Sequence, residues 1–373
     1  MKIICKQEKL VKALNIVSKA VSQTSTLEIT KGILIKTEGD MQISLSATDI
    51  QISITTGMDA IVNEKGGTVV SARLFTDLVR RLPSGDILIA TDEKNRVSIK
   101  TEFSEYDLQG KEEEEFPRID SDEEGKKISL EKELLRDMID GTAFAASIDE
   151  AKGIITGVLF EIKDGVLALV ALDGFRVAIR REVVGENKGD EIKAIIPGKL
   201  MREISKILAD TEGEEDVLLD IGSRRVKLFT GETLVRANLL DGEYIKYRDI
   251  PKESKISIVS RRNELLDAME RVAMLKTKGK SAAVRFSLSE KAITVSARAD
   301  EGRGKETVFV EKKGEDLEIG FDAKFLIEAL KAITDDEIEM LFNTGISPCM
   351  IRPVEGDRFE YLVMPVKLST INA

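Results

Sequence analysis

The sequence predicts an α+β fold in which one kind of domain is repeated three times. Three segments of similar pattern begin at Lys2, Lys127 and Lys255, and each is an alternating strand that runs into an amphipathic helix. A second strand and helix follow about 65 residues later in each segment. Alternating strands bounded by turn residues lie between and after the helices. Each repeat therefore reads β-α-β-β-β twice, with two helices packed on antiparallel sheets.

Six helices are expected, and their apolar residues recur at helical spacing. The first helix of each repeat is predicted at residues 6–21, 131–147 and 261–276. Its core-facing pairs, at equivalent i and i+4 positions, are expected to be Leu10 and Leu14, Leu134 and Met138, and Leu265 and Met269. The second helix is predicted at residues 71–82, 198–209 and 322–333. Its buried positions are expected to be Leu74, Leu78 and Leu82, then Leu200, Ile204 and Leu208, then Phe325, Ala329 and Ile333.

Two polar linkers, each containing proline, separate the repeats. They begin at Pro117 and Lys246. The predicted domains are therefore residues 1–120, 121–250 and 251–373.

Composition limits the chemistry that the chain could perform. The 373 residues are 42% hydrophobic and 33% charged, which suits globular packing, and no apolar run is long enough for a transmembrane helix. Met1–Cys5 lacks the apolar core of a signal peptide, so a cytosolic protein is expected. Cys5 and Cys349 stand in strand-like apolar surroundings and are expected to be small buried hydrophobes. The chain has no histidine, which removes histidine triads and histidine-ligated metals and leaves carboxylate, lysine or tyrosine chemistry.

Positive charge is concentrated on the predicted helices. Their net charge sums to +6, whereas the whole chain carries −11, so the remainder carries −17. A solvated helix face also collects lysine, and charge alone leaves that alternative open. If helices of all three repeats share one face, that face would attract a polyanion without reading its bases.

The stretch Glu360–Leu368, EYLVMPVKL, is an apolar run that contains a proline. Short runs of this kind are most often buried strands. Pro365 cannot donate a ladder hydrogen bond, which favours an edge strand.

Five stretches, together with the threefold repeat, resemble the bacterial DNA polymerase III beta subunit family, the replicative sliding clamps. They are EEFP at 114–117, ALDGFRVAIR at 171–180, IIPGK at 195–199, SPCMI at 347–351 and YLVMPVKL at 361–368. The resemblance covers the whole chain in order. It implies three DNA-clamp domains per protomer and a head-to-tail homodimer that forms a six-domain ring around double-stranded DNA, without sequence preference. Such a protein is a non-catalytic processivity factor in the cytoplasm, at replication forks on the nucleoid, with no cofactor and no membrane partner.

The resemblance also implies a groove between the second and third domains for short peptides. Its partners would be the DNA polymerase III catalytic subunit, the clamp loader, other polymerases and repair proteins. The matching residues are Ile155, Leu172, Gly174, Phe175, Arg176, Val177, Ile245, Arg248, Phe325, Ile346, Leu362, Val363, Met364, Pro365 and Val366. Alternate side chains of the terminal strand would face the core, and the others, with the adaptable Met364, would line the groove.

Two further surfaces follow from the same resemblance. The DNA-facing residues would be Arg73, Arg80, Lys152, Lys199 and Arg202. The dimer interface would hold Phe103, Glu105, Tyr106, Leu108, Met274, Leu275, Arg303 and Lys305. The charge at this interface is rearranged relative to the family pattern. We hypothesise that Glu102, Glu105 and Asp107 of the first-domain strand oppose Arg303 and Lys305 of the third domain across the junction of two protomers.

Two other functions compete with this interpretation. A carboxylate enzyme could use Glu112–Glu115 or the Asp173-Gly174 turn, but neither stretch supplies a paired base and nucleophile, and the glutamate run is typical of a solvated surface. A scaffold that binds peptides without DNA would keep the terminal run but would not need basic helices in several repeats.

Overall fold

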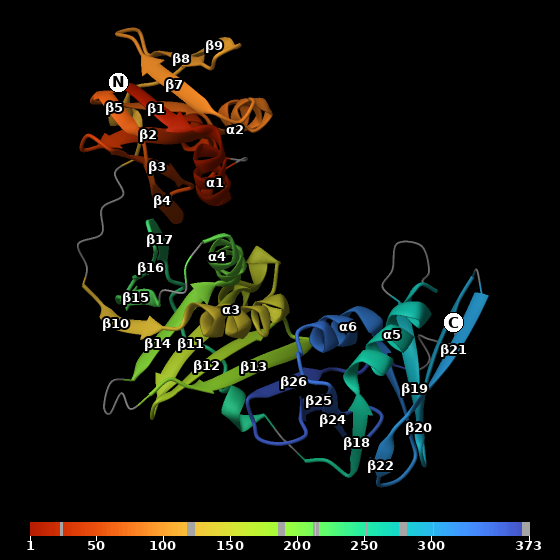
Figure 1. The fold of residues 1–373 in the computed structure, drawn as a ribbon. Coiled ribbons are helices and arrows are strands. Elements are labelled where there is room, and N and C mark those ends of the chain that lie inside the picture. The colour runs from red at the N-terminus through yellow and green to blue at the C-terminus, as the bar shows by residue number, and fades with distance from the viewer. Residues whose placement is uncertain are drawn as a thin grey trace. The chain divides into compact units, whose positions relative to one another are not determined.

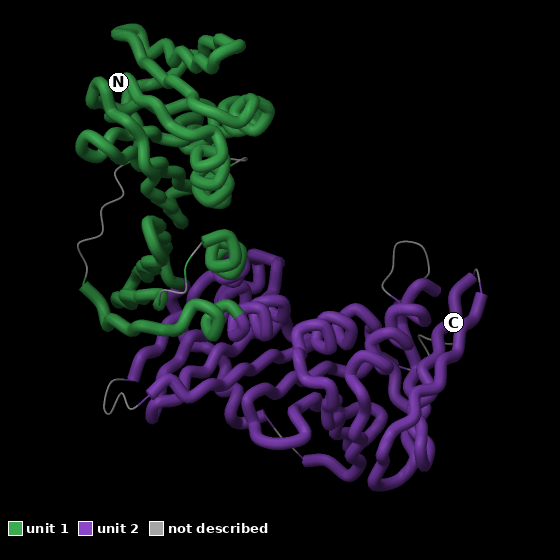
Figure 2. The backbone as a smooth tube through the Cα atoms, viewed as in Figure 1, with its two compact units in different colours: residues 1–136, 203–239 green, residues 137–202, 240–373 purple. Residues whose placement is uncertain are grey.

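The computed structural model describes residues 1–22, 25–117, 124–185, 191–211, 213, 216–250, 253–275, 282–300 and 302–367. Two compact units are formed, shown in Figure 2: unit 1 holds residues 1–136 and 203–239, and unit 2 holds residues 137–202 and 240–373. The boundary expected at residues 120 and 121 and the residues after Lys367 lie outside the described part of the chain.

The predicted order of elements is confirmed, with one extra short strand in the first and third repeats (Figure 1). The first repeat contains β1 (Lys2–Lys6), α1 (Gln7–Val17), β2 (Gly32–Glu38), β3 (Gln42–Thr48), β4 (Ile52–Asp59), the extra β5 (Ile61–Glu64), β6 (Gly67–Ser71), α2 (Ala72–Arg81), β7 (Asp86–Thr91), β8 (Arg96–Lys100) and β9 (Glu105–Gln109). The second contains β10 (Lys126–Leu130), α3 (Lys132–Asp140), β11 (Gly157–Lys163), β12 (Val166–Leu172), β13 (Arg176–Val183), β14 (Ile192–Pro197), α4 (Gly198–Asp210), β15 (Val217–Ile221), β16 (Arg225–Thr230) and β17 (Thr233–Asn238). The third contains β18 (Ile256–Arg261), α5 (Arg262–Ala273), β19 (Ala283–Ser289), β20 (Ala292–Ala299), β21 (Gly302–Phe309), the extra β22 (Glu311–Lys313), β23 (Leu317–Asp322), α6 (Ala323–Lys331), β24 (Glu337–Phe342), β25 (Cys349–Pro353) and β26 (Phe359–Val363).

The third predicted helix is shorter than expected. α3 ends at Asp140, well before residue 147, and a 3₁₀ turn at Ala143–Ala145 follows it. The amide of Gly141 still donates to the Asp137 carbonyl, and the Thr142 hydroxyl then donates to the Met138 carbonyl. A glycine followed by a β-branched residue that hydrogen-bonds its own backbone is a poor continuation of a helix.

Some predicted core positions on the helices are wrong by one residue or more. In α3 the buried apolar residues are Leu135, Met138 and Ile139, and Leu134 is only partly buried. Because α3 begins at Lys132, Leu135 and Ile139 take the places that Leu10 and Leu14 have in α1. In α2 the core face is Ala72, Phe75, Thr76, Val79 and Leu82, which leaves Leu74 exposed and Leu78 partly buried. In α6 Phe325 is partly buried, and Leu326 points into the core instead. The remaining expected positions are buried: those in α1, α4 and α5, Met138 of α3, Ala329 of α6, and Leu82 and Ile333 just after α2 and α6.

Unit 1 contains two antiparallel sheets. The smaller has the strand order β5-β1-β7-β8-β9, and α1 and α2 pack side by side in the same unit. The larger has the order β10-β15-β16-β17-β4-β3-β2-β6. It joins two repeats, because β17 pairs with β4 in the register Val235 to Ile54.

Unit 2 repeats this arrangement. Its larger sheet has the order β14-β11-β12-β13-β26-β25-β24-β18-β22, and its smaller sheet the order β21-β20-β19-β23. α5 and α6 lie side by side (Figure 1). Here β13 of the second repeat pairs with β26 of the third, Val177 opposite Leu362. This pairing brings the two sequence stretches of the expected groove together.

The terminal apolar run forms a central strand, so the expectation that Pro365 stands in an edge strand is wrong. β26 is paired with β13 on one side and β25 on the other, and all five of its residues are buried. Pro365 follows the end of β26 and needs no ladder hydrogen bond there. Within β26, Tyr361 packs against the Phe144 and Phe359 rings, whereas Leu362 packs with Leu341 and Met350, so successive side chains enter different clusters and both are buried.

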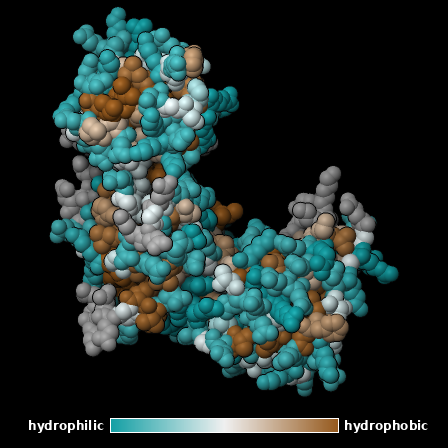
Figure 3. Space-filling model, viewed as in Figure 1, coloured by the Kyte–Doolittle hydropathy of each residue, from teal (hydrophilic) through white to brown (hydrophobic). Residues whose placement is uncertain are grey.

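Both cysteines are free and buried, as expected from their apolar surroundings. Burial, with a smaller contribution from Asp86, raises the pKa of the Cys5 thiol to about 12, and burial also raises the pKa of Cys349. On the face drawn in Figure 3, hydrophobic side chains are scattered among hydrophilic ones. Within the residues that the structure describes, no helix has the length and apolar character to span a membrane.

Candidate functional site

A tight turn between β12 and β13 forms the centre of the candidate site. Asp173 caps the turn, because its Oδ1 accepts hydrogen bonds from the amides of Phe175, at 2.9 Å, and Arg176, at 3.1 Å. Gly174 has φ of 94°, a left-handed conformation that glycine adopts without steric cost. The turn projects Phe175 into solvent, where its side chain is 54% exposed. A large apolar side chain held outward in this way is a candidate contact for a partner.

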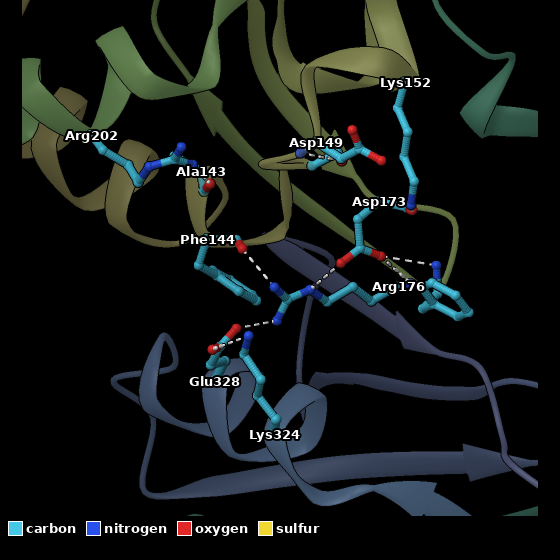
Figure 4. Close-up of polar contacts among 11 residues, drawn as sticks. Ala143, Phe144, Asp149, Lys152, Asp173, Arg176, Arg202, Lys324 and Glu328 are labelled. Atoms are coloured by element: carbon cyan, nitrogen blue, oxygen red, sulfur yellow. Dashed lines mark hydrogen bonds and ion pairs between the residues drawn. The ribbon is translucent and has the colours of Figure 1, made fainter. Parts of the chain in front are cut away.

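Arg176 is buried beneath this turn and is surrounded by hydrogen-bond acceptors (Figure 4). It is only 7% exposed. Its Nε donates to Asp173 Oδ2 at 3.1 Å, its Nη2 donates to the Phe144 carbonyl at 2.8 Å, and its Nη1 pairs with the Glu328 carboxylate. Arg176 therefore supports the turn from below, and its guanidinium is already engaged by the protein itself.

Aromatic rings and cations are stacked alongside the turn. The Phe175 and Phe325 rings are nearly parallel, with centroids 5.8 Å apart. The Arg176 guanidinium lies 4.8 Å from the Phe325 centroid and 5.2 Å from that of Phe144. Lys152 lies 5.3 Å from the Phe175 centroid and donates to the Asp173 carbonyl at 2.8 Å. Cation–π contacts of this kind contribute about 0.5–2 kcal/mol each.

Two apolar clusters adjoin the turn and share the partly buried Val177 and Ile250. The larger cluster consists of Leu159, Val170, Leu172, Ile179, Ile195, Tyr244 and Tyr247, with Ile154, Ile155 and Leu240 packed against it. The smaller consists of Leu341, Met350 and Leu362. The expected groove residues Ile155, Leu172, Val177 and Leu362 thus lie in one continuous apolar region, drawn from the second and third repeats.

The residues after β26 run past the same turn. The Met364 amide donates to the Phe175 carbonyl at 2.8 Å, and the Val366 amide donates to the Gly320 carbonyl at 2.8 Å. Val363 is buried, whereas Met364 is 44% exposed and Pro365 and Val366 are partly buried. Met364 and Phe175 are therefore exposed apolar side chains on the turn and on the segment after β26, above a buried floor.

Sequence reasoning missed Tyr244, Tyr247 and Ile250. The Tyr244 hydroxyl donates to the Gly157 and Val170 carbonyls, and the Tyr247 hydroxyl donates to Glu161 Oε2 at 2.9 Å. Burial raises the pKa of Tyr244, and burial followed by the Glu161 hydrogen bond raises that of Tyr247 to about 12. Two tyrosines three residues apart in a polar linker were the available signal, since a tyrosine ring seeks burial while its hydroxyl seeks a partner.

Three other expected groove residues lie at exposed positions. Ile245, between the two buried tyrosines, is partly exposed to solvent, and Ile346 is exposed in the turn before β25. Arg248 pairs with Glu161 and lies 5.0 Å from the Tyr247 centroid. Each of these three side chains is accessible, but the two apolar clusters do not include them.

The basic residues expected to face DNA differ in their availability. Arg73 and Lys199 are exposed near the start of α2 and α4. Arg80 donates to the Asn15 side chain, and Arg202 donates to the Ala143 carbonyl at 2.8 Å. Lys152 donates a hydrogen bond to the Asp173 carbonyl, beside the candidate groove.

Exposed apolar residues also mark two unpaired sheet edges. β9 ends the smaller sheet of unit 1, with Tyr106 exposed on it, Leu108 partly buried, and Phe103, 81% exposed, just before it. β21 ends the smaller sheet of unit 2 and carries exposed Arg303 and Lys305. Met274, 78% exposed, follows α5, and Leu275 approaches β21 at Gly304, where a Cβ atom would stand 2.8 Å from it. Such edges invite pairing with another strand.

Within the described residues, no group of three or more acidic, cysteine or histidine side chains is arranged to hold a metal ion. The polar groups of the candidate groove are already engaged within the protein. Arg176 is paired beneath the turn, and the Tyr244 and Tyr247 hydroxyls each donate to protein acceptors. The arrangement suits recognition of an apolar peptide.

Comparison with known proteins gives matches along the whole chain. Family models for the N-terminal, central and C-terminal domains of the DNA polymerase III beta subunit match residues 1–120, 129–246 and 248–367. The beta sliding clamp of Halalkalibacterium halodurans is 32% identical and that of Synechococcus elongatus 30%, with 98% and 99% of this chain and 100% of each relative covered. Among solved structures, the DNA polymerase sliding clamp of Bacillus subtilis (29% identity, TM-score 0.92) and the DNA polymerase III beta subunit of Thermotoga maritima (29%, TM-score 0.89) each share 98% of this chain and 99% of theirs.

Proposed function

Because the chain belongs to the DNA polymerase III beta subunit family, we propose that it closes around duplex DNA as a head-to-tail dimer and tethers replication proteins through a peptide groove. Function as a sliding clamp that confers processivity on the polymerase follows from the family. The observation that carries the proposal is that models of all three clamp domains match the chain in order. The domain boundaries 1–120, 121–250 and 251–373 remain part of the proposal.

The peptide groove would lie along the β12–β13 turn and the segment after β26. Phe175 and Met364 would contact the peptide directly, above a floor that includes Leu172, Val177 and Leu362. A floor of buried apolar side chains with a few exposed anchors is typical of sites that take amphipathic peptides. Its occupants would be peptides of the polymerase III catalytic subunit, the clamp loader, other polymerases and repair proteins.

Ring closure would pair β9 of one protomer with β21 of the next. Glu105 and Asp107 are exposed on β9, and Arg303 and Lys305 are exposed on β21, so the two edges carry opposite charge. Phe103, Tyr106 and Leu108 would bury apolar area against Met274 and Leu275. An edge strand covered in this way no longer exposes its unpaired amides and carbonyls.

DNA would be held by linkage and by weak contacts with phosphates. Arg73 and Lys199 are exposed near the start of their helices, where they could contact phosphates without reading bases. We propose Arg80, Lys152 and Arg202 as further contacts, although each already has a protein partner in the free chain. The proposed clamp has no catalytic activity, requires no cofactor, and works in the cytoplasm at replication forks.

The test is retention on DNA of different topology. The purified protein is loaded by its cognate clamp loader on a nicked circular plasmid, and bound protein is separated from free protein by gel filtration at 0.5 M NaCl. Linearisation should release the protein, because a ring held only by linkage slides off a free end. Electron microscopy of the protein without DNA should show rings of two protomers.

Equal retention on linear and circular DNA would overturn the topological mechanism. Failure to bind either DNA, with peptide binding intact, would favour a peptide-binding scaffold.

A further inference from the structure

Glu328 of α6 contacts the candidate groove from behind. It lies in the third repeat, yet its carboxylate pairs with Arg176 of the second repeat, within unit 2 (Figure 4). Lys324, one turn earlier on α6, lies 3.9 Å from the same carboxylate. Glu328 is a third exposed at its side chain and does not belong to either apolar cluster of the groove floor.

Arg176 depends on this pairing. Its cationic side chain is buried, and Asp173 compensates only the Nε side of the guanidinium. Without Glu328, Nη1 would lose its acceptor. Removing one partner of a buried ion pair costs far more than the pair contributes, because the remaining charge stays desolvated. The Arg176 side chain would then have to rotate toward water, and Asp173 would either move with it or lose its ion-pair partner.

The same helix supports the turn through a second contact. Phe325 precedes Glu328 by three residues, so both side chains lie on one face of α6. The Phe325 ring stacks on Phe175 and also lies against the Arg176 guanidinium. α6 thus presents a ring and a carboxylate to the underside of a turn that belongs to another repeat.

The turn in turn fixes the segment after β26. Asp173 orients the amides of Phe175 and Arg176, and the Phe175 carbonyl accepts from the Met364 amide. A chain of direct contacts therefore runs from Glu328 through Arg176 and Asp173 to Phe175 and Met364.

We propose that Glu328 is a positioning residue for the peptide groove: through Arg176 it holds Phe175 and Met364 in the geometry that binds a partner peptide. This rests on the proposed peptide-binding function. Peptide affinity then depends on a carboxylate of the third repeat that acts through Arg176. Peptide binding in turn stabilises the contact between the second and third repeats, because coupling between two sites is reciprocal.

The test compares Glu328→Gln with a matched control, Glu270→Gln. Glu270 pairs with Lys331 of α6 at 2.7 Å, and among the described residues it makes no hydrogen bond or ion pair with the turn, so the control removes an α6 ion pair and leaves the groove unchanged. The probe is a fluorescein-labelled peptide selected from a random phage library on the wild-type protein, kept only if Met364→Glu abolishes its binding. Fluorescence anisotropy should show affinity about 5- to 10-fold weaker for Glu328→Gln, within the usual range of coupling between sites, and unchanged for Glu270→Gln.

A second readout does not require a peptide. Hydrogen exchange of the Phe175, Arg176 and Met364 amides should become faster in Glu328→Gln than in Glu270→Gln, while exchange in β11 and β12 stays the same. In an Arg176→Met background, Glu328→Gln should have no further effect on affinity, because the connecting residue is gone.

Equal affinities for the two glutamine variants, or full additivity with Arg176→Met, would overturn the positioning role. If no selected peptide depends on Met364, the proposed peptide groove itself is refuted. Unchanged hydrogen exchange at the Phe175, Arg176 and Met364 amides would refute the positioning role of Glu328 without reference to any peptide.

Discussion

Asp49 caps the β3–β4 turn in the same way that Asp173 caps the β12–β13 turn. Asp49 Oδ1 accepts from the amides two and three residues later, at 3.0 and 2.8 Å, and Asp173 Oδ1 does so at 2.9 and 3.1 Å. At each turn, an amide at the end of a strand of the next repeat, or directly after it, donates to a carbonyl of the turn: Asn238 to Gln51 at 3.0 Å, and Met364 to Phe175 at 2.8 Å. The chain therefore builds one turn twice, at two junctions between repeats.

Only the second of these turns stands over an apolar floor. At the second junction Val177 pairs with Leu362. The equivalent strand pair at the first junction is Ser53 with Arg236. The backbone is repeated, but the side chains that would receive an apolar peptide are not.

Ile50 is expected to strain the first turn. It has φ of 77° where the second turn has Gly174, and a β-branched residue in this region costs about 1–2 kcal/mol. Because Ile50 is exposed, little burial is lost on substitution. Ile50→Asn should raise the free energy of unfolding by about 1 kcal/mol, since asparagine tolerates this conformation. Urea unfolding followed by circular dichroism measures it, and Ile50→Ala, which keeps a Cβ at the same φ, should gain less. A loss of stability in Ile50→Asn would show that the side chain makes a contact worth more than the strain.

Met364 and Leu362 are expected to separate binding from stability. Met364 is exposed beside Phe175, so Met364→Ala should weaken binding of the selected peptide about tenfold, as for an interface anchor, and leave the melting temperature almost unchanged. Leu362 is buried in the smaller cluster, so Leu362→Ala should cost about 2–5 kcal/mol of stability. Calorimetry and anisotropy on the same samples distinguish the two effects. A large stability loss in Met364→Ala would place its side chain in the core.

Opposite charge on β9 and β21 is expected to strengthen the protomer interface. Glu105→Lys or Lys305→Glu alone should weaken dimerisation about two- to fivefold per junction at low salt, because exposed ion pairs are worth about 0.2–1 kcal/mol. The double variant should recover affinity, since the charges are exchanged across each junction. Sedimentation equilibrium at 50 mM and 500 mM NaCl measures this, and Glu311→Lys on β22 provides a charge-matched control.

Glu105 already pairs with Lys100 on the neighbouring strand of its own sheet, which will reduce the effect. If dimer affinity and its salt dependence were the same in all these variants, the charge pairing would have to be abandoned.

Tyr247 is expected to make stability depend on alkaline pH. Its pKa is raised from about 10 in the unfolded chain to about 12 in the folded protein, so the unfolded state loses the proton first. The stabilisation is complete below pH 10 and is lost as the pH rises toward 12, by on the order of 1–2 kcal/mol. Tyr247→Phe should be less stable than wild type at pH 8, because phenylalanine cannot make the hydrogen bond to Glu161. The difference in stability between the two proteins should shrink above pH 10. Urea unfolding at pH 8, 9.5 and 11 tests this, and a difference that stays constant would contradict it.

The sequence by itself determined the repeat, the order of the elements and the main stretches of the candidate groove. These features are local: a helix or a strand leaves its period in the residues that form it, and the ALDGFRVAIR and YLVMPVKL stretches can be recognised wherever they lie. The alternating strands, the six helices and the buried cysteines follow from such patterns. At Leu134 the predicted core position was wrong by one residue. The sequence predicted a helix start at residue 131, whereas α3 begins at Lys132.

Only the tertiary structure decided which strands meet and which side chains are sequestered. β13 and β26 are separated by the second half of the second repeat and most of the third, and no local period specifies that they pair. The pairing makes the terminal run a central strand. Arg176 was expected to line the groove, yet Asp173, the Phe144 carbonyl and Glu328 converge on it from three parts of the chain. Burial of an ion depends on every group packed around it, and those groups are brought together only by the fold.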